Sequence, residues 1–242
     1  ETGLYVRGGG ADENLYLLDG NPVYHVNHLL GFFSAFNPDA IKNTRFYKGS
    51  FPAEYGGRLS SVVDVRMNDG NRQEYHGNIS VGLLSARANL EGPIVKDRSS
   101  FNVSVRRTWL DLITGTALAI VNKNSDTKES FGYHFFDINA KVNHSFSERS
   151  RAYLSFYMGQ DAFRQGSKEK HEDSDDMFLW RWGNLIGSAG WNYVFGQKLF
   201  GNLMVGYSRF RSHIRQEAKG YEIEGNRAER QSIKRDSRYK SE

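Results

Sequence analysis

Two successive segments of the chain alternate apolar and polar side chains with a period of two. In residues 136–143, phenylalanine, isoleucine, alanine and valine alternate with aspartate, asparagine, lysine and asparagine. Ala152, Leu154, Phe156 and Met158 alternate in the same way with mostly polar neighbours. Successive side chains of a β-strand point to opposite faces, so this pattern predicts a sheet whose two faces meet different environments.

The connections between the expected strands alternate in length. Strands are predicted over about six runs, at 77–91, 99–109, 133–146, 150–160, 178–195 and 198–216. Short turns at 91–98, 147–149 and 196–198 alternate with long polar connections at 110–131, 161–177 and 217 to the end. This alternation is typical of a transmembrane β-barrel, in which tight periplasmic turns alternate with longer extracellular loops. A soluble antiparallel sheet with flexible loops is the alternative.

Strand length and aromatic placement favour the membrane barrel. Most of these runs exceed the roughly 9–11 residues that cross a bilayer at a tilt. Aromatic side chains gather toward the strand ends, as interfacial girdles do. About six strands cannot close a barrel, because the smallest membrane barrels use about eight, and an unclosed sheet exposes its edges. We therefore expect the chain to be a fragment of a longer protein.

Composition excludes several classes of function. The chain has no cysteine, so disulfides, thiolate metal sites and cysteine nucleophiles are excluded. Its 32 basic and 28 acidic residues give a net charge of +4, which is too small to indicate a nucleic-acid partner. Twenty-five glycines and an aromatic content of 14% favour a mostly β chain.

Residues 1–72 differ in texture from the rest, and we predict two domains, 1–72 and 73–242. The first combines short strands with turns and a short helix over 29–36. Proline disfavours helix in the residue before it, so the helix is expected to end at Asn37-Pro38. A second helix is expected over 110–121, in a long loop of the second domain.

No catalytic, metal or cofactor site is predicted. The glycines at 8–10 lack the strand, helix and lysine that accompany a phosphate-binding loop. The acidic run at 171–176 lacks the spacing of a calcium loop and is interpreted as a solvated charge run. Ser60, Asp64 and His76 supply the residue types of a catalytic triad, but no nucleophile elbow accompanies them.

Four ordered segments within the first 65 residues resemble the plug domain of TonB-dependent outer-membrane receptors. They are LYVRGG at 4–9, LYLLDGNPVY at 15–24, NPDAI at 37–41 followed by FYKG at 46–49, and FPAEYGGRLSSVVDV at 51–65. The segments GPI at 92–94 and RRT at 106–108 extend the resemblance into the barrel with less specificity. The YGG turn at 55–57 departs from the SusC-like glycan importers and resembles receptors that often carry an upstream carboxypeptidase-regulatory-like domain.

The resemblance implies a fold, a function and partners. The fold is expected to be mostly β, a fragment of a plugged transmembrane β-barrel with a small α+β plug portion (1–72) before antiparallel barrel strands. The function is expected to be active import of a scarce nutrient, such as an iron chelate, cobalamin, peptide or glycan, across the outer membrane of a Gram-negative cell. The implied partners are the TonB–ExbB–ExbD complex, the ligand and outer-membrane lipid, with no cofactor. A non-transporting surface receptor or adhesin that uses the long loops is the alternative.

The same resemblance places candidate residues. The plug loop 24–34 and the loop 110–131 are expected to contact the ligand, and the candidates are Tyr24, His25, His28, Phe32 and Phe33. Ordinary loop histidines are the competing interpretation of His25 and His28. Charged plug residues are expected to anchor the plug to the barrel wall, and the candidates are Arg7, Glu54, Arg58 and Asp64.

Overall fold

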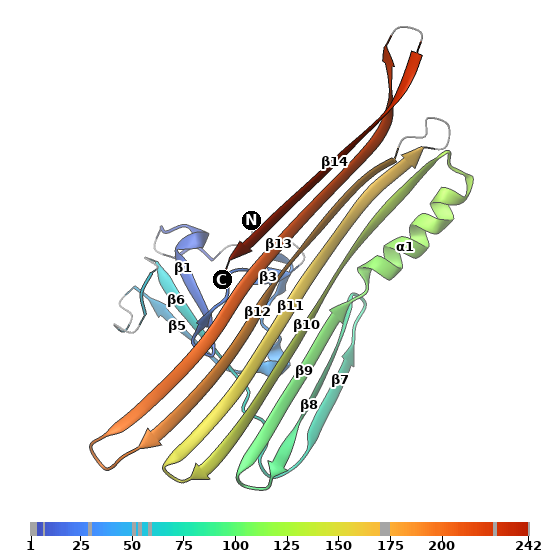
Figure 1. Cartoon of the computed structure of the whole chain (residues 1–242). Coiled ribbons are helices and arrows are strands. Elements are labelled where there is room, and N and C mark those ends of the chain that lie inside the picture. The colour runs from blue at the N-terminus through green and yellow to red at the C-terminus, as the bar shows by residue number, and fades with distance from the viewer. Residues whose placement is uncertain are drawn as a thin grey trace.

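The computed structural model describes residues 4–6, 8–28, 31–49, 52, 55–57, 60–169, 175–224 and 227–241. They form a four-stranded sheet, a two-stranded hairpin and an eight-stranded sheet (Figure 1). We call residues 4–72 the N-terminal section and the eight-stranded sheet the wall. The last strand of the N-terminal section ends at Met67 and the first strand of the wall begins at His76. The domain boundary at residue 72 stays a prediction.

The four-stranded sheet has the order β2-β1-β6-β5. Its strands are β1 (Asn14–Leu18), β2 (Asn21–Pro22), β5 (Ile41–Lys48) and β6 (Ser61–Met67). Asp19 and Gly20 both have positive φ, at 47° and 84°, which is the two-residue hairpin turn that aspartate-glycine pairs favour. β1 and β6 pair in parallel and β5 pairs antiparallel with β6, so β6 is central and carries mostly buried side chains.

The helix predicted over 29–36 is wrong for the described residues, because Phe33–Ser34 form strand β4. β4 pairs with β3 (Asn27–His28) in a short antiparallel hairpin. Tertiary contacts with the wall override the helical pattern, since Phe33 packs on the ring of Phe135 with centroids 5.3 Å apart. Helical structure in the described part of this section is limited to 3-10 turns, η1 (Ala11–Glu13) and η3 (Pro38–Ala40) among them.

The wall consists of eight consecutive antiparallel strands. They are β7 (His76–Val81), β8 (Ser85–Val95), β9 (Ser99–Thr108), β10 (Thr127–Ser147), β11 (Ser150–Glu169), β12 (Asp175–Val194), β13 (Phe200–Glu224) and β14 (Arg227–Ser241). The sheet is open, with β7 and β14 at its edges. The mostly β fold class, a small mixed section followed by antiparallel strands, is confirmed.

Three strand predictions need correction. The run 77–91 is two strands, because the chain reverses at Gly82, whose amide bonds the carbonyl of Ser85 at 2.8 Å. The polar connection expected over 161–177 largely continues β11 and β12, and the tail from 217 continues β13 and forms β14. The last two stretches, 161–177 and 217 onward, are mostly polar on both faces, so they lack the alternation that marks a half-buried strand.

Helix α1 (Leu110–Val121) joins β9 to β10 and confirms the helix predicted there. It runs beside the upper part of β10, where Thr114 donates a hydrogen bond to the carbonyl of Phe131 at 2.9 Å (Figure 1). Of the helices that the structure describes, none is long and apolar enough to cross a membrane.

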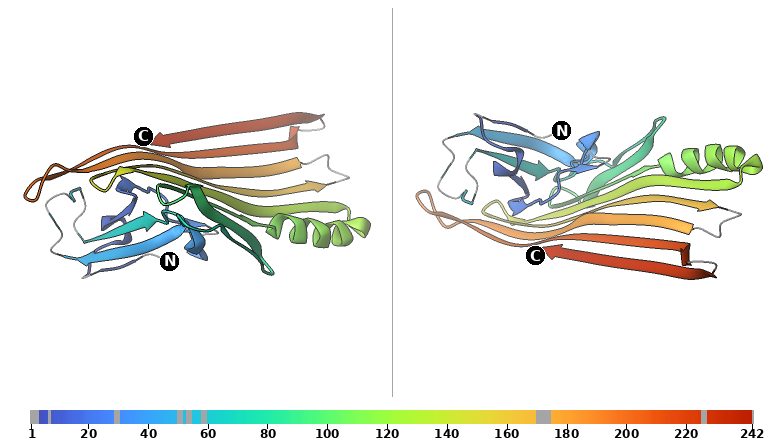
Figure 2. Two further views of the ribbon diagram at one scale, coloured as in Figure 1. Left: turned by 90° about the horizontal axis from the view of Figure 1, so that it is seen from below. Right: turned by 90° about the horizontal axis from the view of Figure 1, so that it is seen from above.

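The two faces of the wall differ as the alternation predicts. The N-terminal section lies against one face, which we call the inner face (Figure 2). There the side chains of β10 are buried and mostly polar, including Asp137, Asn139 and Lys141. On the other, outer face apolar side chains are exposed, with Leu154 at 64% and Val205 at 65%.

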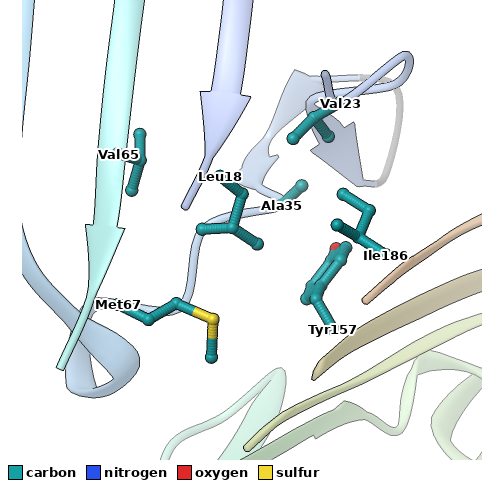
Figure 3. Close-up of a cluster of buried hydrophobic side chains, with 7 residues drawn as sticks. All are labelled: Leu18, Val23, Ala35, Val65, Met67, Tyr157 and Ile186. Carbon is teal, nitrogen blue, oxygen red and sulfur yellow. The ribbon is translucent and has the colours of Figure 1, made fainter. Parts of the chain in front are cut away.

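An apolar core joins the N-terminal section to the wall. Leu18, Val23, Ala35, Val65 and Met67 come from the N-terminal section, and they meet Tyr157 of β11 and Ile186 of β12 (Figure 3). Burial of a large apolar side chain stabilises a fold by about 1.5–3 kcal/mol. This core therefore helps to hold the two parts together, beside the polar contacts around it.

Candidate functional site

His28 inserts into the inner face of the wall. Its Nδ1 lies 2.7 Å from Oδ2 of Asp161 on β11, and its Nε2 lies 3.7 Å from Oδ2 of Asp137 on β10. The imidazole stacks on Phe135 with ring centroids 4.2 Å apart and an interplanar angle of 3°. All of these side chains are buried, at 3% exposure or less. The β3–β4 hairpin is thus fixed to the wall by a histidine between two carboxylates.

Arg106 of β9 completes this buried network. Its Nε and Nη2 lie 2.8 and 2.6 Å from Oδ2 of Asp137, and Nη2 also donates to the carbonyl of Ser34 at 2.7 Å. The hydroxyl group of Tyr133 donates a hydrogen bond to Oδ1 of Asp161. We call these residues, His28, Arg106, Tyr133, Asp137 and Asp161, the His28 network.

The His28 network is not fully satisfied by protein partners. Nε2 of His28, Oδ1 of Asp137 and the neighbouring hydroxyl of Tyr157 are buried without a hydrogen-bond partner among the described residues. Each buried polar group without a partner costs about 1–3 kcal/mol. Separation of the hairpin from the wall would let water bond to these groups, so the network holds the contact specifically without making it permanent.

Lys141 of β10 forms a second polar link below the first. Its Nζ lies 3.3 Å from Oδ1 of Asp19, 3.1 Å from Oδ1 of Asp69 and 3.1 Å from the carbonyl of Met67. Lys42 bonds the other oxygen of Asp69 at 2.5 Å. One wall lysine therefore binds both the β1–β2 turn and the chain that leaves β6.

Polar side chains of the wall also bind backbone carbonyls of the N-terminal section. The pairs, donor first, are Asn184 with His25 at 2.7 Å, Ser208 with Pro22 at 2.5 Å, and Ser100 and Asn143 with Asp69 at 2.6 and 3.0 Å. Each bond satisfies a partly buried main-chain carbonyl. Because these hydrogen bonds go to backbone atoms, they depend little on which side chains the N-terminal section carries.

The structure separates the five residues predicted to contact a ligand. His28 and Phe33 are packed into the wall, and His25 lies near the rings of Trp182 and Phe210, with centroids 6.1 and 5.9 Å away. Burial lowers the pKa of His25. Tyr24 and Phe32 are exposed, at 44% and 83%. Ligand contact by any of the five stays a prediction.

The four predicted anchors cannot all be located. Arg7, Glu54 and Arg58 lie outside the described residues. Asp64 is buried and binds Arg66, whose Nε and Nη2 both lie 3.0 Å from its Oδ2, and Tyr55 donates a 3.4 Å hydrogen bond to the same oxygen; both partners belong to the N-terminal section. Anchoring by these four residues stays a prediction.

The wall residues that form the His28 network and the Lys141 link were not predicted from the sequence. A signal for them was present, since Asp137 and Lys141 are charged residues on one face of the alternating segment 136–143. A charged side chain on the buried face of a sheet needs a partner. The partners come from strands up to 133 residues away, which the local pattern does not specify.

Aromatic side chains cover the His28 network on the side of α1. Tyr133, Phe135 and Trp182 are buried there, and Phe33, Leu110, Phe163, Trp180 and Phe210 pack against them. The rings of Trp180 and Trp182 lie 4.2 Å apart. In the part of the chain with described coordinates, no group of histidine, aspartate and glutamate residues is arranged to hold a metal ion.

Acid is expected to weaken the Lys141 link through Asp69. Burial raises the pKa of the Asp69 carboxyl, but Lys141 and Lys42 lower it further, so its pKa lies below the usual value. A carboxyl with a lowered pKa stabilises the folded state fully above its unfolded pKa of about 4 and loses that contribution as pH falls through the folded value. The stability of the intact protein, measured by chemical unfolding, should therefore fall below about pH 4.

The Asp69→Asn variant should be less stable at neutral pH and should show a smaller decline in acid. Glu148→Gln, in the exposed turn between β10 and β11, is the matched control and should behave like the native protein. An unchanged acid dependence in Asp69→Asn would show that other carboxyls govern it.

Part of the chain matches a known protein family. Residues 1–63 match the family model described as TonB-dependent Receptor Plug Domain. No curated protein matches the sequence.

Solved structures resemble the chain at low identity. The siderophore receptor PirA from Acinetobacter baumannii is 14% identical, with a TM-score of 0.45, over 94% of this chain and 40% of that one. A mutant of the ferric enterobactin receptor PfeA from Pseudomonas aeruginosa is 15% identical, with a TM-score of 0.44, over 97% and 48%. PirA from Pseudomonas aeruginosa is 15% identical, with a TM-score of 0.39, over 96% and 51%. The chain thus spans about half or less of the length of these receptors.

Proposed function

We propose that this chain, a TonB-dependent receptor fragment whose residues 1–63 belong to the plug-domain family, is the gating part of an outer-membrane importer. The N-terminal section is the plug, and the wall supplies strands of the barrel around it. The cargo is a scarce nutrient, such as an iron chelate, cobalamin, a peptide or a glycan. The energy comes from the inner membrane through the TonB–ExbB–ExbD complex, which pulls on the plug.

The observation that carries the proposal is the polar character of the contact between plug and wall. A permanent domain interface is usually hydrophobic, whereas this one combines a small apolar core with the His28 network and the Lys141 link. Buried ion pairs add little net stability but fix one arrangement, because a mispaired charge is costly. Such a contact supports a plug that fits one position in the closed state and separates when it is pulled.

In this proposal the gate works by differential binding between two plug states. A ligand that binds the exposed side of loop 24–34 and the aromatic residues near it changes the plug equilibrium only if it prefers one state. The hairpin β3–β4 connects that loop directly to the His28 network. Ligand binding and plug release are therefore coupled through the same short segment.

A disulfide between plug and wall tests the gating. A Cβ placed on Gly206 of β13 would lie 1.4 Å from the side-chain Oδ1 of Asn21, so the two Cβ atoms lie within the roughly 4 Å that a disulfide requires. The chain has no native cysteine to interfere. With Asn21→Cys and Gly206→Cys, energised uptake should stop on oxidation and return on reduction. Uptake is measured in cells with a panel of labelled iron chelates, cobalamin, peptides and glycans.

The control disulfide joins two wall strands and leaves the plug free. Val103 and Ala140 lie directly opposite each other on β9 and β10. The variant with Val103→Cys and Ala140→Cys should therefore show unchanged uptake in both redox states. If no labelled compound accumulates, or if loss of the TonB complex does not matter, the importer proposal is overturned and a surface receptor or adhesin replaces it.

A further inference from the structure

The outer face of the wall changes from apolar to basic toward the end that carries α1, the upper end in Figure 1. Nearer the short turns, its residues on β11, β12 and β13 are apolar: Leu154, Phe156, Met158, Leu185, Ala189, Leu203, Val205 and Tyr207. Directly opposite residues of antiparallel strands share a face, and the registers carry this face upward to four arginines. They are Arg164 on β11, Arg181 on β12, and Arg209 and Arg211 on β13.

The strand register makes these arginines neighbours. On β11 the residue opposite Arg181 is two positions from Arg164, and on β13 the residue opposite Arg181 is two positions from Arg211. Arg181 is therefore diagonal to both arginines. Diagonal positions of an antiparallel pair are about 7–8 Å apart. Arg209 and Arg211 follow each other on one face of one strand, about 7 Å apart. The four side chains therefore form one continuous group, which we call the arginine patch.

Among the described residues, the arginine patch has positive charge without an ion-pair partner. The outer-face residues among and beside its members are Gln160, Ala162, Leu179, Gly183, Leu185 and His213, and none of them is acidic. Glu217, higher on β13, is already bound by Arg215 at 2.8 and 2.5 Å. None of the four arginines makes an ion pair with any described residue, whereas Arg106 on the inner face lies 2.6 Å from Asp137.

Position and chemistry together identify the partner. Residues that follow an apolar, lipid-facing band lie at the level of lipid headgroups. The planar guanidinium group binds phosphate with two parallel hydrogen bonds, and several guanidiniums about 7 Å apart fit an anion with more than one phosphate. Like charges this close repel one another unless an anion lies between them.

We propose that the arginine patch binds the phosphate groups of a multiply phosphorylated lipid in the membrane leaflet around the upper end of the wall. This proposal rests on the membrane position of the wall and is independent of import. The bound lipid would neutralise the patch and fix the depth of the wall in the membrane.

The experiment uses the intact protein, purified in detergent and stripped of lipid. It is mixed with micelles that contain cardiolipin, a lipid with two phosphates, and retained lipid is counted by native mass spectrometry. The test variant carries R164Q, R181Q, R209Q and R211Q. The matched control removes four exposed charges from the short turns at the opposite end with K96Q, R98Q, R149Q and K198Q.

Cardiolipin affinity should fall about fivefold per arginine, and at least about a hundredfold for the four together, while the control retains native affinity. Equal loss in the control would overturn the proposal, because general charge attraction would then explain retention. Equal retention in the test variant would overturn it as well. Displacement of cardiolipin by an equal concentration of inorganic phosphate would assign the patch to free phosphate instead.

Uptake measurements separate this proposal from the proposed function. A variant that loses the lipid but imports normally supports the patch and leaves the importer intact. A native protein that binds cardiolipin through the patch but imports nothing removes the importer alone.

Discussion

Replacement of Arg106 by leucine is expected to weaken the contact between plug and wall by about 3–5 kcal/mol. Asp137 is completely buried, and Nε and Nη2 of Arg106 both bond its Oδ2, so the variant leaves a buried carboxylate without that partner. The same change removes the donor to the carbonyl of Ser34 and frees strand β4. Hydrogen exchange of the β3–β4 amides in the intact protein should accelerate by at least about a hundredfold, since each 1.4 kcal/mol is tenfold.

The neighbouring arginine supplies a matched control. Arg107 is on the opposite face of β9, is 56% exposed, and pairs with Asp111 four residues away. Exposed pairs of this kind contribute about 0.3–0.5 kcal/mol, so Arg107→Leu should leave the exchange of β3–β4 nearly native. The double variant Arg106→Leu, Asp137→Leu should recover much of the loss, because it removes the buried charge together with its partner. Equal exchange in Arg106→Leu and Arg107→Leu would show that the network does not hold the hairpin.

The fold class was predictable because its main signal is local. Residues 136–143 alternate between an apolar and a polar face, and any strand with two different environments must carry such a pattern. Strand β14 gave no such signal, because residues 227–241 are mostly polar on both faces. Its strand pairing with β13 comes from backbone hydrogen bonds, which sequence periodicity does not report.

The sequence singled out loop 24–34 for ligand contact, which stays a prediction, and gave no sign that His28 and Phe33 of this loop pack on the wall. Asp161 lies 133 residues from His28, and only the registers of β9, β10 and β11 bring it beside Asp137 and Arg106. Asp64 illustrates the same limit, since a charge in the middle of strand β6 finds its partner two residues away, at Arg66, as readily as on the wall.

Replacement of Gly70 by alanine is expected to destabilise the contact between the plug and the wall by about 2–4 kcal/mol. Gly70 has a φ of 81°, which L-residues adopt only with strain, and an added Cβ would lie 2.2 Å from the carbonyl oxygen of Phe101 on β9. That oxygen belongs to the backbone of a paired strand and cannot move aside as a side chain can. The chain leaving β6 must therefore shift away from the wall, and the bonds that Ser100 and Asn143 donate to the carbonyl of Asp69 must lengthen or break.

Urea unfolding of the intact protein, followed by tryptophan fluorescence, measures this loss, because Trp182 is buried at the contact between plug and wall. Gly187→Ala on β12 is the control, since an added Cβ there meets nothing within 4 Å and its φ is not positive. Alanine usually stabilises such a strand position slightly relative to glycine. A midpoint for Gly70→Ala equal to that of Gly187→Ala would mean that the connection from plug to wall is pliable. In the importer that we propose, a pull on the plug would then act without straining the first strands of the wall.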